Sequence, residues 1–186
     1  MISTAQEFYK LGHRCEKNGY YTHSMIYSPR VQIFKHDSGE LHAPIEVDIL
    51  TSAAVNAGVV RRELRKKNDD NEAGIESAMR ERMGRLLYLF EKHGVKNLVL
   101  GSFGTGVFQN SVEVVARLWV ELLMAENARF KHSFERILFA IIDDQTVKKF
   151  QQVFYGEGKE KEAGEVTSTP PQESESDRMV GDTPQT

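Results

Sequence analysis

The chain has 186 residues, of which 40% are hydrophobic and 27% charged, and its formal net charge is −3. This length suits one ordinary domain, and the mild acidity argues against non-specific nucleic-acid binding, which normally requires a basic excess. Cys15 is the single cysteine, which excludes an intrachain disulfide and a cysteine-based zinc site. The longest apolar run, Ile137–Ile142, is too short to cross a bilayer. We therefore expect an intracellular protein, cytoplasmic or nuclear, that binds neither membranes nor nucleic acid.

The N-terminal part predicts a short helix followed by strand structure. Residues 3–17 are weakly amphipathic, with Phe8 and Leu11 at helical spacing. Residues 20–34 are rich in aromatic and β-branched side chains, which favour strands, and Pro29 among them implies an edge or a bend. The composition of Asp37–Gly39 predicts a turn.

A second strand is predicted over Ile45–Leu50, where apolar and acidic residues alternate. It ends in Thr51–Gly58, a segment of small residues. Such residues let the backbone approach a ligand or another element closely. The charged stretch over residues 61–71 predicts a solvated connection, whose basic residues are interpreted as surface rather than as a nucleic-acid patch.

The second half of the chain alternates helices and strands. Apolar residues at helical spacing predict helices over residues 72–92 and 112–123, and a third over 145–154. The nearly continuous apolar run over residues 136–142 is typical of a strand that is covered on both faces. This order predicts an α/β fold in which helices cover both faces of a sheet.

Ligands bind at the carboxyl ends of strands in such folds. Three segments follow predicted strands, so we expect them to gather at one edge of the sheet: Thr51–Gly58, Gly101–Asn110 and Asp143-Asp144. From residue 156 onward the composition changes to Lys, Glu, Gly, Ser, Thr and Pro, which predicts disorder. Residues 1–155 are accordingly assigned to one domain and 156–186 to a disordered tail.

The strand Leu98–Leu100 leads into a glycine-rich loop, Gly101–Asn110, which a helix follows. Asn110 is predicted to cap that helix, with Glu113 three positions later. Backbone N–H groups in such a loop can converge on an anion, so one hypothesis is a phosphate or diphosphate site. The other is an ordinary turn whose glycines supply positive φ. The loop matches neither the P-loop nor the dinucleotide fingerprint, so a dehydrogenase is not expected.

The residues Gly101–Phe108 resemble the diphosphate-binding loop of macrodomains. Three segments in order are similar to the microbial-type poly(ADP-ribose) glycohydrolase family: Met25–Phe34, Leu50–Gly58, and the glycine-rich loop with Asn110 and Val115-Ala116-Arg117. The resemblance covers about Glu7–Phe154. It implies a three-layer α/β/α macrodomain-like fold with a mixed sheet, and ADP-ribose or an ADP-ribosylated protein as the partner.

The resemblance also implies the roles of individual residues. Backbone amides over Gly104–Val107 would hold the diphosphate, and Phe108 would pack on the distal ribose. The alternative for Phe108 is a core aromatic that closes the loop. No cofactor and no metal are expected, because the six histidines show no metal-like spacing. The candidate ligand-binding residues are Gly101, Ser102, Gly104, Thr105, Gly106, Val107, Phe108, Thr51 and Asn56.

Catalytic elements of the family have no counterpart in this sequence. Family enzymes carry a Gly-Gly-Gly loop and then a Gln-Glu-Glu element, in which a glutamate protonates the leaving oxygen. The chain contains no Gly-Gly pair, and Gln6-Glu7 is followed by Phe8 instead of a second acid. We therefore predict no catalytic residue here and a domain that is incomplete at its N-terminus, with an apolar sheet edge or face exposed. The chain is either a fragment of a hydrolase or a degenerate copy that at most binds ADP-ribose.

Overall fold

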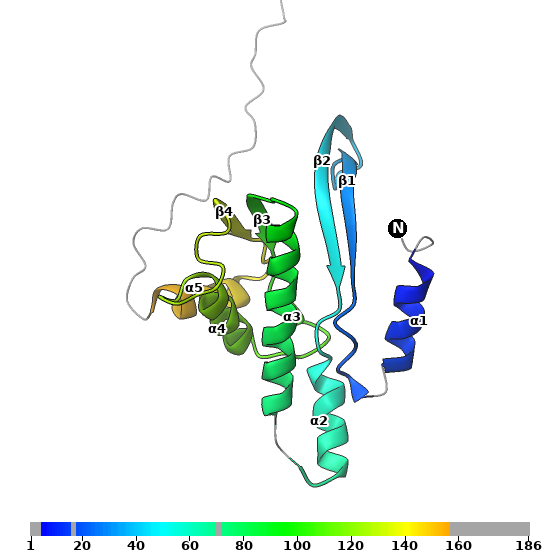
Figure 1. Ribbon diagram of the computed structural model, residues 1–186, viewed down its shortest axis with the longest axis vertical. Helices are drawn as coiled ribbons and strands as arrows, with labels where there is room; N and C mark the ends of the chain where they lie inside the picture. Colours follow the sequence, from blue (N-terminus) through cyan, green and yellow to red (C-terminus); the bar gives the residue numbers. More distant parts are fainter. Residues whose placement is uncertain (1–4, 16–17, 70–71, 157–186) are drawn as a thin grey trace, which may run out of the picture.

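The computed structural model describes residues 5–15, 18–69 and 72–156, which form five helices and four strands (Figure 1). The predicted tail, 156–186, lies outside these residues except for Gly156, which follows the last helix. No described helix has the length and apolar character required to cross a membrane. The elements in chain order are α1 Gln6–Cys15, β1 Met25–Lys35, β2 Leu41–Ser52, α2 Ala57–Lys66, α3 Ala73–Lys92, β3 Asn97–Leu100, α4 Val112–Leu123, β4 Arg136–Phe139 and α5 Asp144–Tyr155.

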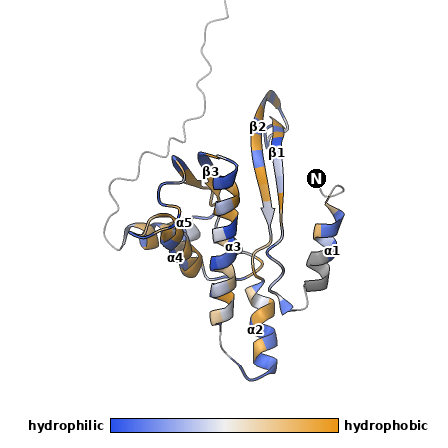
Figure 2. Cartoon of the chain, viewed as in Figure 1, coloured by the Kyte–Doolittle hydropathy of each residue, from blue (hydrophilic) through white to orange (hydrophobic). Residues whose placement is uncertain are grey.

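Strands β1 and β2 form a long antiparallel hairpin, with Met25 opposite Ser52 and Ile33 opposite Ile45. The register shifts between Ser28 and Val31, so Pro29 lies in an irregular part of the strand, as predicted. The far half of the hairpin extends beyond the helices, and Figure 2 shows that hydrophobic residues continue along it. Several of these side chains are exposed: Ile33, Phe34, Leu41 and Ile45.

Strands β3 and β4 form a second, parallel sheet in which Asn97 pairs with Arg136 and Leu100 with Phe139. The α/β class with mixed strand directions is therefore confirmed, but the described strands make two sheets of two strands each instead of one. The prediction that residues 136–142 are covered on both faces is wrong. Strand β4 ends at Phe139, and the alternate residues Val99 and Leu138 are 69% and 53% exposed. One face of this sheet is therefore open.

Helices α3 and α4 provide most of the core. The apolar stripe predicted on α3 is confirmed, and on α4 both Leu118 and Trp119 are almost completely buried. The buried members of the α3 stripe are Ile75, Met79, Met83, Leu86, Leu87 and Phe90.

The connection predicted over residues 61–71 is wrong in its first half, because helix α2 continues to Lys66. The charged residues obscured two features that favour a helix. Asn56 caps the helix, since its Oδ1 accepts a hydrogen bond from the N–H of Val59. Val60 and Leu64 are four residues apart and pack on the core from one side of the helix.

Candidate functional site

The glycine-rich loop packs directly on the segment that follows β2. Gly104 has φ +80°, and a Cβ atom added there would lie 2.4 Å from Ala54 Cβ and 2.7 Å from Asn110 Nδ2. Real side chains do not tolerate such approaches, so this position requires glycine for its conformation and for the space. An atom added at Gly106, in contrast, would meet nothing within 4 Å. Close packing therefore holds the loop backbone at Gly104, whereas Gly106 faces open space.

Asn110 connects the two segments. It is 6% exposed, and its Nδ2 donates hydrogen bonds to Val55 O at 2.7 Å and to Gly104 O at 2.9 Å. The prediction that Asn110 caps α4 is wrong, because the N-cap is Ser111, whose Oγ accepts from the N–H of Val114. The amide of Asn110 is engaged instead in holding two backbone segments together, which the local sequence pattern does not distinguish from capping.

Part of the loop's backbone is already satisfied internally. The N–H groups of Thr105 and Gln109 donate to Ser102 O and Gly106 O, and the hydroxyl of Thr105 donates to Ser102 Oγ. Within the described part of the chain, the consecutive N–H groups of Gly106, Val107 and Phe108 donate to no protein acceptor. Gly106 and Val107 are also exposed. Successive free N–H groups in a turn are the donors that an anion requires.

Phe108 lies between the loop and a segment near the N-terminus. Its ring stacks on that of Tyr21, with centroids 5.7 Å apart and an interplanar angle of 19°. Tyr21 itself has a positive φ of 54°. Phe108 is half-buried against the core, while its carbonyl accepts a hydrogen bond from the N–H of Gly58. This position is compatible with both alternatives for Phe108, and its contact with a ribose stays a prediction.

The remaining candidate residues lie on both sides of the loop. Asn56 is half-buried at the start of α2, where its side chain caps that helix and its N–H donates to Gly19 O at 2.7 Å. Thr51 is half-buried near the end of β2, opposite Ile26. Asp143, expected at the same edge, caps α5 through Thr146, and this hydrogen bond lowers the pKa of the Asp143 carboxyl.

Arg82 belongs to the surroundings of the loop, although no motif in the sequence indicates it. It is 1% exposed, and its guanidinium donates to Ala53 O at 2.8 Å and to Tyr20 O at 2.7 Å. Burial lowers its pKa to about 10, so it remains cationic at neutral pH. Arg82 thereby joins the segment after β2 to the segment that carries Tyr21. A signal was present, since an arginine at a core position of the α3 stripe needs buried acceptors.

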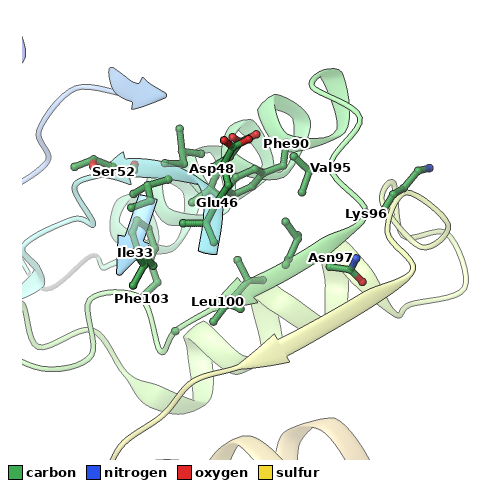
Figure 3. A pocket seen from close by; sticks show the side chains of 18 of the residues that line it. Ile33, Glu46, Asp48, Ser52, Phe90, Val95, Lys96, Asn97, Leu100 and Phe103 are labelled. Atoms are coloured by element: carbon green, nitrogen blue, oxygen red, sulfur yellow. The ribbon is translucent and has the colours of Figure 1, made fainter. Parts of the chain in front are cut away.

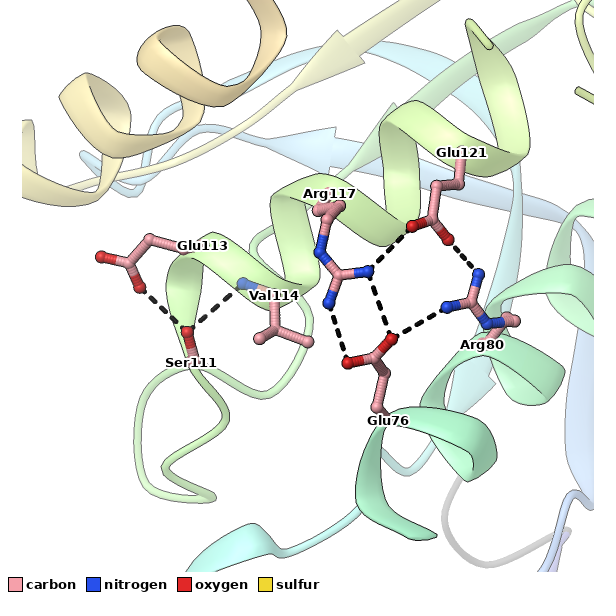
Figure 4. Close-up of polar contacts among 7 residues, drawn as sticks. All are labelled: Glu76, Arg80, Ser111, Glu113, Val114, Arg117 and Glu121. Carbon is pink, nitrogen blue, oxygen red and sulfur yellow. Dashed lines mark hydrogen bonds and ion pairs between the residues drawn. The ribbon is translucent and has the colours of Figure 1, made fainter. Parts of the chain in front are cut away.

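Arg117, which belongs to one of the family-like segments, fixes α4 against α3 (Figure 4). Its guanidinium forms two hydrogen bonds with the carboxylate of Glu76 and one with Glu121 at 2.8 Å. Arg80 contacts the same two carboxylates from α3. These ionic bonds hold the pKa of Glu76 below its usual range. They orient the helix that follows the glycine-rich loop.

A groove of about 1010 Å³ begins beside the loop and runs between β2 and β3 (Figure 3). Glu46–Ser52 line one side and Val95–Gly101 the other, and Phe103 of the loop also belongs to the lining. The candidate residues Thr51 and Gly101 both belong to this lining. Among the described residues, no group of three or more His, Cys, Asp or Glu side chains has the arrangement of a metal site.

Comparison with known proteins finds similarity to poly(ADP-ribose) glycohydrolases. The family model for the microbial-type PARG catalytic domain matches residues 1–36. The structure of poly(ADP-ribose) glycohydrolase from Deinococcus radiodurans in complex with ADP-ribose is 35% identical over 80% of this chain, with a TM-score of 0.70. The enzyme from Thermomonospora curvata is 31% identical over 82% of this chain, with a TM-score of 0.69. The chain spans 59% and 53% of these two proteins. No curated protein sequence matches.

Proposed function

Because this chain is a relative of the microbial-type poly(ADP-ribose) glycohydrolases, we propose that it binds ADP-ribose through the glycine-rich loop. One observation carries the proposal. Among the described residues, three consecutive N–H groups of the loop, at Gly106, Val107 and Phe108, have no acceptor, and they lie beside Gly104, a position that only glycine can occupy. A diphosphate supplies acceptor oxygens and negative charge that such donors favour.

Residues on both sides of the loop are proposed to flank the ligand. Arg82 and Asn110 tie the neighbouring backbone segments to fixed positions, so the loop meets its ligand with little reorganisation. The face of Phe108 that Tyr21 does not cover is the proposed contact for the distal ribose. Thr51 and Asn56 are proposed to line the same cleft.

We further propose that hydrolysis of ADP-ribose polymers or conjugates needs sequence that this chain does not contain. The loop Gly101–Asn110 holds no carboxylate, and the Gly-Gly-Gly and Gln-Glu-Glu elements of the family have no match here. Glycoside hydrolases ordinarily use an acid to protonate the leaving oxygen. The chain accordingly provides the diphosphate-binding half of a glycohydrolase site.

The second candidate is a binding module without any catalytic role, either a degenerate copy or a fragment with no partner. The lack of a sequence match to the family's catalytic acid supports this candidate as much as it supports the first. The two candidates differ in one outcome. The first predicts turnover of poly(ADP-ribose) when the missing portion of a related enzyme is supplied, and the second predicts binding without turnover under all conditions.

Isothermal titration calorimetry of the full chain with ADP-ribose tests the shared claim. We expect ADP-ribose to bind and AMP, which lacks the diphosphate, to bind at least tenfold more weakly. Gly106→Asp adds a carboxylate in open space next to the free N–H groups, so it should weaken ADP-ribose binding at least tenfold without lowering the melting temperature. Met124→Asp is the matched control, because Met124 is exposed and lies beyond α4. Equal affinity of AMP and ADP-ribose, or of both variants, would contradict the proposal.

A further inference from the structure

Two histidines meet at the turn of the β1–β2 hairpin. The centroids of the His36 and His42 rings lie 4.4 Å apart, with an interplanar angle of 46°. His36 directly follows β1 and is exposed, while His42 is half-buried near the start of β2. The spacing of the histidines along the chain indicates no metal site, whereas the reversal of the chain at this turn brings these two rings into contact.

The backbone of the turn holds the two histidines in place. The N–H of His36 donates to Glu40 O at 2.9 Å, and the N–H of Gly39 donates to His36 O at 2.9 Å. Next to this turn, Lys35 pairs with Leu41 in the strand ladder. Gly39 has φ +94°, a conformation that glycine adopts without strain. A closed, hydrogen-bonded turn therefore presents both rings.

A hydrogen bond determines which nitrogen of His42 is available to a ligand. Nδ1 of His42 lies 2.7 Å from Ala43 O. A carbonyl oxygen only accepts, so Nδ1 carries the proton, and in the neutral ring Nε2 keeps its lone pair. Histidines that bind metal ions almost always donate their other N–H to a carbonyl, a carboxylate or water in this way. His42 thus already has the hydrogen bonding of a metal ligand, and the exposed ring of His36 lies beside it.

The position of the two rings suits one metal ion that both imidazoles share. Two nitrogens bound to the same zinc ion lie about 3 Å apart, because each bond is about 2.1 Å long. Ring nitrogens lie at the rim of an imidazole, so centroids 4.4 Å apart are compatible with this separation. Imidazole suits Zn²⁺, Ni²⁺ and Cu²⁺, whereas Mg²⁺ and Ca²⁺ prefer oxygen ligands. The turn also carries two acids, Asp37 and Glu40, against one base, Lys35, and this balance favours a cation.

We propose that His36 and His42 form a two-imidazole site for a divalent transition-metal ion of the zinc, nickel and copper group. Water completes the coordination, because the described residues supply no third His, Cys, Asp or Glu ligand. The site lies where the hairpin extends beyond the helices (Figure 1). Strand β1 has 11 residues, so roughly 30 Å separate the site from the end of the hairpin beside the glycine-rich loop. The proposal is therefore independent of ADP-ribose binding.

Nuclear magnetic resonance of the full, untagged chain tests the proposal with Zn²⁺ as the probe. Before Zn²⁺ is added, the imidazole nitrogen signals of His42 should show the tautomer with the proton on Nδ1. Zn²⁺ should shift the ring signals of His36 and His42 before those of any other histidine. The amides of His36 and Gly39 should then exchange with solvent at least threefold more slowly, because the ion links the two sides of the turn. Shifts at other histidines first, or no shifts, overturn the proposal.

Single substitutions measured by calorimetry with Zn²⁺ assign the binding to this turn. His36→Gln and His42→Gln each remove one imidazole and should weaken Zn²⁺ binding at least tenfold. His132→Gln is the matched control, at an exposed histidine outside the hairpin, and should leave the affinity unchanged. Because His36 is exposed, His36→Gln should retain the urea midpoint of the parent chain. Equal affinity of the parent chain and His36→Gln, or an equal loss in His132→Gln, overturns the proposal. ADP-ribose is titrated separately, so failure of the proposed function is distinguished from failure of the metal site.

Discussion

Replacement of Gly104 by alanine tests whether the glycine-rich loop is held in place by close packing. At φ +80° a residue with a Cβ is disfavoured by about 1–2 kcal/mol. The added atom also lies 2.4 Å from Ala54 Cβ, and relief of such overpacking costs about 1–3 kcal/mol more. We therefore expect Gly104→Ala to lower the free energy of unfolding by about 3 kcal/mol, a large share of the 5–15 kcal/mol of an ordinary domain.

Urea unfolding followed by tryptophan fluorescence provides the measurement, because the single tryptophan, Trp119, lies in the core. With a slope of about 2 kcal/mol/M, the midpoint should fall by about 1.5 M. Gly106→Ala is the matched control, since its Cβ has open space and its φ is not positive. We expect it to change the unfolding free energy by less than about 0.5 kcal/mol. A loss below about 1 kcal/mol in Gly104→Ala, or equal losses in both variants, would refute the packing argument.

Three further predictions concern groups around the loop. Arg82→Met should lower the free energy of unfolding by about 3 kcal/mol in urea titrations, because it leaves two part-buried carbonyls, of Ala53 and Tyr20, without this donor. Arg117→Ala should cost about 1 kcal/mol in the same assay, a modest amount because its ion pairs are half-exposed. The pKa of Glu113 is lowered from 4.5 to about 2, mainly by Lys149, so its contribution is present above pH 4.5 and is lost as the pH falls toward 2. Thermal melts across this range should show a loss of at most about 1 kcal/mol, which Glu113→Gln removes.

Sequence patterns predicted the elements whose signal is local. The α3 stripe and the turn at Asp37–Gly39 depend on residues a few positions apart, and both are confirmed. The sequence pattern does not indicate helix α2, because its charged residues hide a short apolar side formed by Ala57, Val60 and Leu64. The role of Asn110 was missed because its partners, Val55 and Gly104, lie in segments that meet only in three dimensions.

The sheet predicted from the sequence differs from the observed sheets most clearly at residues 136–142. The apolar run over residues 136–142 has the composition of a strand buried on both faces, and yet Leu138 is 53% exposed. A continuously apolar composition indicates a strand that is suited to burial on both faces. In the structure, alternate residues of β4 are exposed. Where the two disagree, at β4 and at Val99 on β3, the sequence is suited to contacts that the described residues do not make. The disagreement and the groove lie on the same two-stranded sheet, β3 and β4, one face of which the described residues leave open.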